Sequence, residues 1–80
     1  MPLYFFDITD TGKTWLDSEG TELANLEKAR EEALRTLGEI VKDKLPDGDY
    51  RNFLIEIREG DGAPLLSASL ALRVERKLPG

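Results

Sequence analysis

The chain has 80 residues, 40% of them hydrophobic and 34% charged, which predicts one globular domain over residues 1–80. It contains no Cys and no His, so disulfides, the usual structural zinc sites and catalysis by a Cys thiolate or a Ser-His-Asp triad are excluded. Its formal net charge of −5 repels phosphate backbones and anionic lipids, so neither nucleic acid nor a membrane is an expected partner.

The first predicted element is a hairpin within residues 4–17. In the segment TDTGK, a three-residue loop over Asp10–Gly12 would place Gly12 in the left-handed conformation that such loops require. Counting outward from this loop pairs Asp7 with Trp15. One face of the hairpin then carries Tyr4, Phe6, Ile8 and Leu16. The other face carries Phe5, Asp7, Trp15 and Asp17, so Phe5 and Trp15 are predicted neighbours.

An amphipathic helix is predicted from Leu26 to the residues before Pro46. Its apolar residues recur at steps of three and four, as one buried helix face requires: Leu26, Ala29, Ala33, Leu37, Ile40 and Val41, with Leu34 widening the stripe. Asn25 is the predicted N-terminal cap, and Pro46 ends the helix before a turn in the segment LPDGD. Gly38 costs up to about 1 kcal/mol relative to Ala inside a helix, which predicts close backbone packing there.

A second hairpin is predicted around Asp61-Gly62, the strongest two-residue turn signal in the chain. A tight turn at these residues pairs Ile57 with Leu66 and Ile55 with Ala68. This register agrees with the apolar alternation, because one face then collects Phe53, Ile55, Ile57, Leu66, Ala68, Leu70, Leu72 and Val74.

The element order predicts an α+β fold of the two-layer ββαββ type. Its four-stranded antiparallel sheet has one long helix on one face, and a right-handed crossover gives the strand order 2-1-3-4. The predicted core contains Phe6, Ile8, Leu37, Ile55 and Leu70.

Several segments resemble a family of short acidic bacterial proteins classed as a domain of unknown function: MPLYFFD, LDSEGTEL, NLEKAREEAL and LPDGDYRNFLIEIREGDG. The residues that carry the resemblance are Tyr4, Phe5, Phe6, Asp7, Asp17, Gly20, Glu22, Pro46, Asp47, Gly48, Asp61 and Gly62. It implies a discrete domain and no particular chemistry. A weaker likeness, at the level of the fold, is to HicB-type antitoxin domains, which neutralise a small toxin.

No enzymatic activity and no cofactor are expected. Ser67 and Ser69 alternate outward on the last strand without a partner, and no lysine shows the desolvation that a reactive amine needs. The carboxylates of Asp7, Asp17, Glu19 and Glu22 could converge, but their spacing lacks the alternation and closing Glu of a calcium loop. No metal site is therefore predicted.

The sheet face away from the helix is the predicted interaction surface, because large apolar side chains lie on it among charges of both signs. Its candidate interface residues are Phe5, Trp15, Leu54, Leu65, Ala71 and Arg73. A homodimer or another protein partner, bound through this face or through an edge strand, is the first hypothesis. A small-molecule ligand is the alternative, which a cavity near Trp15 would favour. No secretory signal is recognised and no apolar run approaches ~20 residues, so a cytoplasmic location is expected.

Overall fold

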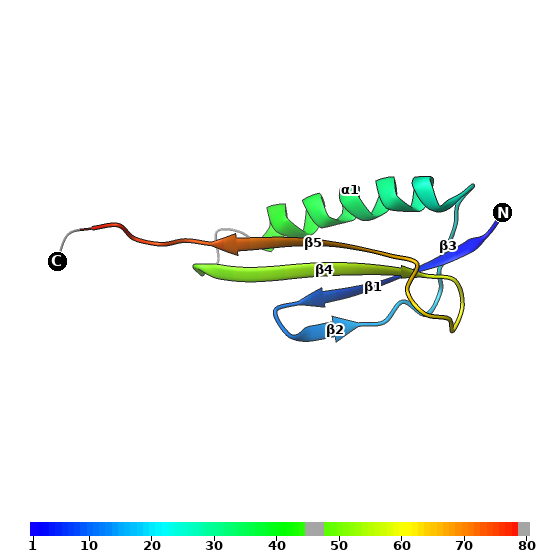
Figure 1. The fold of residues 1–80 in the computed structure, drawn as a ribbon, viewed down its shortest axis with the longest axis horizontal. Helices are drawn as coiled ribbons and strands as arrows, with labels where there is room; N and C mark the ends of the chain where they lie inside the picture. Colours follow the sequence, from blue (N-terminus) through cyan, green and yellow to red (C-terminus); the bar gives the residue numbers. More distant parts are fainter. Residues whose placement is uncertain (45–47, 79–80) are drawn as a thin grey trace.

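The computed structural model describes residues 1–44 and 48–78. In chain order its elements are β1 (Leu3–Asp10), β2 (Lys13–Trp15), β3 (Thr21–Glu22), α1 (Leu26–Lys44), β4 (Tyr50–Arg58) and β5 (Leu66–Arg73). Helix α1 runs along one face of an antiparallel sheet (Figure 1). The four longer strands lie in the order β2-β1-β4-β5, and the short β3 pairs with the start of β1. The α+β fold is therefore confirmed, and β3 is an element that the sequence reading did not include.

The register predicted for the first hairpin is wrong by one residue. Ile8 pairs with Trp15 and Asp10 pairs with Lys13, so the loop is the two residues Thr11 and Gly12. Both have positive φ angles, 45° and 87°, as in the two-residue turns that match strand twist. The one-residue shift moves Trp15 to the face that carries Ile8, which is the helix side of the sheet.

Contacts with β4 hold Thr11 in this unusual backbone conformation. The amide of Thr11 donates to the carbonyl of Asn52 (2.8 Å), and the amide of Asn52 donates to the Thr11 hydroxyl (3.2 Å). Asp10 ends β1 instead of entering the loop, and its carboxylate accepts a hydrogen bond from Arg51 at 2.7 Å. The hairpin register is thus determined by residues about 40 positions away in the sequence.

The helix begins as predicted. The side chain of Asn25 accepts a hydrogen bond from the amide of Lys28 at 2.9 Å, which is the expected capping contact. The prediction for Gly38 is wrong: this residue is exposed, and apart from its chain neighbours and the adjacent helix backbone, no described atom lies within 4 Å of the position that a Cβ would take. Residues 45–47 of the predicted turn, Pro46 and Asp47 among them, lie outside the described residues.

The register of the second hairpin is confirmed, because Ile57 pairs with Leu66 and Ile55 with Ala68. Its turn lies one residue earlier than predicted, since the amide of Gly62 donates to the carbonyl of Glu59 (3.3 Å). Strand β5 begins only at Leu66. Pro64, which lacks an amide proton, lies in the wider loop that results.

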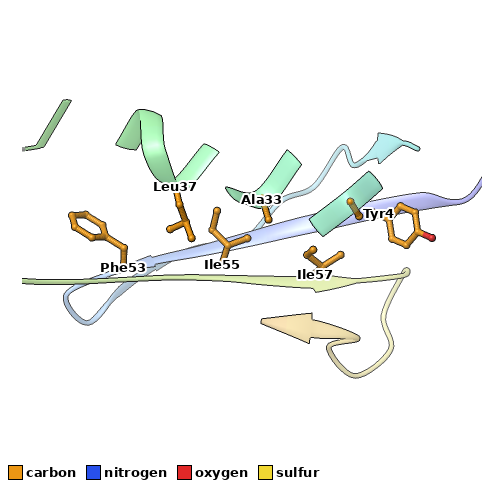
Figure 2. Close-up of a cluster of buried hydrophobic side chains, with 7 residues drawn as sticks. Tyr4, Ala33, Leu37, Phe53, Ile55 and Ile57 are labelled. Carbon is orange, nitrogen blue, oxygen red and sulfur yellow. The ribbon is translucent and has the colours of Figure 1, made fainter. Parts of the chain in front are cut away.

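The core lies between α1 and β4. Figure 2 shows Ala33 and Leu37 of the helix directed toward Phe53, Ile55 and Ile57 of the strand. The buried core residues are Tyr4, Ala29, Ala33, Leu37, Phe53, Ile55 and Ile57. Of the five residues predicted for the core, Leu37 and Ile55 are fully buried, and Phe6 and Ile8 pack at its margin.

Leu70 is the error in that prediction, because 47% of its surface is exposed. The helix packs over β4 and β5, but β5 is the last strand of the sheet. No described strand therefore lies beyond β5 to pack against the outer side of Leu70. No helix in the described part of the chain is long and apolar enough to span a membrane.

Candidate functional site

Asp7, Asp17 and Arg58 form a polar cluster on the sheet face opposite the helix. The Arg58 guanidinium donates from Nε to Asp7 Oδ2 (2.7 Å) and from Nη2 to the carbonyl of Asp17 (3.0 Å). It also donates to the Gly60 carbonyl and stacks over the Phe5 ring at 4.7 Å from the ring centroid. Arg58 of β4 therefore contacts β1, the segment after β2 and the loop after β4.

Both carboxylates of this cluster are held in the charged form. The hydrogen bond from Arg58 is the largest cause that lowers the pKa of Asp7, and the Asp17 amide lowers it further. Burial raises the pKa of Asp17, but the amides of Gly20, Phe6 and Glu19 and the charge of Arg58 outweigh burial, so the pKa falls below its ordinary value.

Asp17 also closes a gap along the outer edge of β1. Strand β2 pairs with residues 8–10 and β3 with residues 3–4. Between these strands, the amide of Phe6 donates to Asp17 Oδ2 (3.1 Å), and the amide of Asp17 donates to Asp7 Oδ1 (2.9 Å). A side chain thus supplies the acceptor that a neighbouring strand would otherwise provide.

Gly20 completes this arrangement because no other residue fits there. Its φ is +75°, and an added Cβ would lie 2.9 Å from Leu3 Cγ and 3.1 Å from Phe5 Cε1. Asp7, Asp17 and Gly20 all carry the family resemblance in the sequence, and the structure brings them into one place. Their shared role is to hold the segment between β2 and β3 against β1.

The cluster offers no site for a metal ion. Asp17 already accepts hydrogen bonds from three backbone amides, and both Asp7 oxygens face Arg58. Glu19 and Glu22, which the sequence offered as further ligands, are exposed. Among the described residues, no group of three His, Cys, Asp or Glu side chains could hold a metal.

The open sheet face differs from the predicted interaction surface. Phe5, Leu54, Ala71 and Arg73 lie on it as predicted, since the register places them on the same side as Arg58 and Ser69. Leu65, 49% exposed, precedes β5. Phe5 is half-buried beneath Arg58, and Asp7 pairs with Glu56 at the centre of the face. The apolar side chains are therefore divided by charged groups, and their role in an interface remains a prediction.

Trp15 is not beside Phe5, so the predicted aromatic pair is wrong. It lines an open groove of about 360 Å³ between the helix and the first hairpin. Trp15 itself is 52% exposed and Leu16 is 73% exposed. The other lining residues are Phe6, Ile8, Asp17, Thr21, Glu32 and Thr36. The indole therefore belongs to the helix side of the molecule.

A second surface lies at the opposite margin of the sheet, and we call it the β5-edge surface. It consists of the outer edge of β5 together with Leu34, Val41, Leu70 and Leu72. Val41, Leu70 and Leu72 line a hollow of about 130 Å³ with Phe53 and Ala71, all of them apolar. Leu34 is seven residues before Val41 and therefore lies on the same flank of α1, where it is 44% exposed.

Strand β5 presents a free edge within the described structure, because it ends the sheet and β4 is its neighbour. Its residues from Leu66 to Leu72 carry no charge. Natural edge strands of this length are usually protected by charges, prolines or a covering segment. The uncharged edge beside exposed leucines is thus the most unusual surface of the molecule.

Sequence reasoning offered an edge strand as one possible interface but did not identify β5 as that strand, although two signals pointed to it. Leu34 extends the apolar stripe of the helix beyond the width that one sheet face buries. Gly38 weakens the helix without serving any contact inside the domain. Both signals predict core packing when taken alone, because a sequence does not show where a helix lies across a sheet.

Comparisons with known proteins give one match. No curated protein and no solved structure matches the chain, so the likeness to HicB-type antitoxins gains no support from them. The model of one family, described as "Domain of unknown function (DUF6894)", matches residues 3–71. This span includes β1 to β4 and most of β5, together with the Asp7, Asp17 and Arg58 cluster. The chain therefore belongs to the DUF6894 family.

Proposed function

We propose that this domain is a non-enzymatic protein-interaction module that self-associates, with a second copy of the chain covering the β5-edge surface. The observation that carries the proposal is an eight-residue edge strand whose first seven residues carry no charge, beside partly exposed Leu34 and Leu70. An unpaired strand of this kind is a template for another strand. Apolar side chains next to it supply the area that makes pairing stable in water.

The distribution of charge permits a second copy to bind at this edge. Two molecules of net charge −5 repel each other over most of their surfaces. The segment from Leu66 to Leu72 is an uncharged stretch at which two copies can meet without opposing like charges. An 80-residue domain also gains little stability from its own core, so burial of this surface would add to it.

We expect the native chain to sediment as a dimer at high concentration and the variant Leu70→Glu to sediment as a monomer. The substitution places a carboxylate where apolar groups would be buried, so the dissociation constant should rise by about 100-fold or more. Leu70 is 47% exposed in one copy, so the far-UV circular dichroism should not change.

The matched control is Leu16→Glu, which places the same charge on an exposed leucine after β2, at the other margin of the sheet. It should leave the dissociation constant unchanged. A native chain that remains monomeric up to millimolar concentration would contradict the proposal, as would equal effects of the two substitutions.

The Trp15 groove favours a second candidate function, binding of a small molecule. Its volume of about 360 Å³ falls within the range of about 300 to 1,000 Å³ typical of ligand sites. The apolar surfaces of Ile8 and Trp15, with the carboxylate of Glu32, suit a compact apolar ligand that bears an amine. Because the chain has one Trp, titration with phenethylamine should give a saturable change in its fluorescence, and a linear response would exclude this site.

A further inference from the structure

We infer that two copies join through β5 in antiparallel pairing about a two-fold axis, and that their α1 helices meet at Gly38. This inference rests on the proposed self-association and adds the geometry of the partner. Pairing of the two β5 strands makes one continuous sheet from two copies, with both helices on the same face.

The outer edge of β5 has the hydrogen-bonding groups that such pairing needs. The amide of Val74 donates to the carbonyl of Asp49 (2.8 Å), so this position faces β4. Antiparallel strands direct alternate residues toward alternate neighbours. The residues whose backbone groups point away from β4 are therefore Ser67, Ser69, Ala71 and Arg73.

Antiparallel pairing is self-complementary, as a two-fold interface requires. The uncharged segment from Leu66 to Leu72 is centred on Ser69. A two-fold axis at Ser69 pairs Ser69 with its counterpart and places Arg73 opposite Leu65 of the other copy. Leu70 then lies diagonally across from its counterpart on the helix side of the sheet. No pair of like charges is brought together along the strands.

The helices come to a packing distance in this arrangement. Helix α1 lies over β4 and β5 (Figure 1). Strands are about 4.8 Å apart, so a two-fold beside β5 would separate the two helix axes by about 10 Å, close to the 8 to 10 Å of packed helices. The flank that faces the axis carries Leu34 and Val41.

Gly38 lies at the level of the axis. Val41 contacts the same hollow as Leu70 and Leu72, and Gly38 is about 4.5 Å further back along the helix, which is about level with Ser69. Apart from its chain neighbours and the adjacent helix backbone, no described atom lies within 4 Å of its Cβ position. A glycine at a crossing point lets two helices approach closely, which explains a residue that weakens the isolated helix.

The charges of the two helices are also complementary in this alignment. Lys42 and Lys44 lie in the last turn of α1, and Glu31 lies nearer its beginning. Antiparallel helices bring the basic last turn of one copy beside Glu31 of the other. The two helix dipoles are then opposed, which is the favourable orientation.

The decisive variant is Gly38→Gln. In one copy the new side chain points into open space and removes a poor helix former, so at low concentration the melting temperature should rise. Between two copies it separates the helices, so the dimer dissociation constant should rise by roughly tenfold or more. A role limited to the stability of the single chain cannot produce these opposite effects.

The control is Glu39→Gln, the same new residue at the next, exposed position of α1, which should leave the dissociation constant unchanged. Strand pairing is tested separately with Ser69→Cys. The chain has no other Cys, and paired Cα atoms about 5.5 Å apart permit a disulfide. Mild oxidation should give a covalent dimer, whereas Thr14→Cys on β2 should stay monomeric.

The outcomes separate the two proposals. A native dimer that neither forms the Ser69→Cys disulfide nor weakens with Gly38→Gln would overturn this geometry and leave self-association standing. A native chain that is monomeric at every concentration would overturn both proposals.

Discussion

The substitution Leu37→Ala should lower the free energy of unfolding by about 2 to 5 kcal/mol, the cost typical of truncating a buried leucine. Leu37 is 1% exposed and contributes from α1 to the core between the helix and β4. The residues around it come from both layers, so the cavity left behind cannot close by moving one side chain. Urea unfolding monitored by circular dichroism measures the effect.

The control is Leu34→Ala, which truncates the same residue type on the same helix where 44% of the surface is exposed. At a concentration low enough to keep the chain monomeric, it should cost less than about 1 kcal/mol. If the two substitutions cost the same, the buried face assigned to α1 would be wrong.

The second large effect is expected for Asp17→Ala. This carboxylate accepts hydrogen bonds from the amides of Phe6 (3.1 Å), Glu19 (3.0 Å) and Gly20 (3.1 Å). Removing the carboxylate leaves these three amides without their acceptor. The amide of Phe6 on the outer edge of β1 is one of them. We expect a loss of about 2 kcal/mol, measured by urea unfolding, whereas Glu19→Ala at the exposed neighbour should change little.

Acid should weaken the native protein through the same carboxylates. The pKa values of Asp7 and Asp17 lie below the ordinary value of 3.8 in the folded state. Their contribution is therefore complete above this value and is lost as the pH falls through the lowered pKa values. Between neutral pH and about pH 2, the Asp17→Ala variant should lose less stability than the native chain. Equal losses would show that Asp17 does not stabilise the fold in its charged form.

Local signals in the sequence were sufficient for most of the fold. Asn25 caps the helix because its side chain competes well for a free amide, and this preference needs no tertiary context. The register of β4 and β5 follows from apolar alternation, although the turn that joins them lies one residue earlier than Asp61-Gly62. These elements were predictable because the residues that determine them are close in the sequence.

Distant contacts explain what the sequence did not show. The segment from Asp10 to Gly12 is compatible with a two-residue or a three-residue loop, and contacts with Asn52 select the shorter one. The two-residue loop places Trp15 on the helix side of the sheet, whereas the three-residue loop predicts it on the open face. Leu70 is exposed because β5 is the last strand of the sheet, and the strand order follows from the packing of the whole domain. Of the two interfaces predicted, the open face and an edge strand, the proposal therefore takes the second, at β5.

Backbone amide exchange of β5, followed by NMR at several protein concentrations, tests self-association through this edge most directly. The amides of Ala68 and Leu70 face β4 and should be protected at every concentration. The amides of Ser67, Ser69 and Ala71 should exchange rapidly in dilute solution and become protected as the concentration rises, because a second copy then covers them. If these three amides exchange equally fast at all concentrations, the edge of β5 is not where two copies meet.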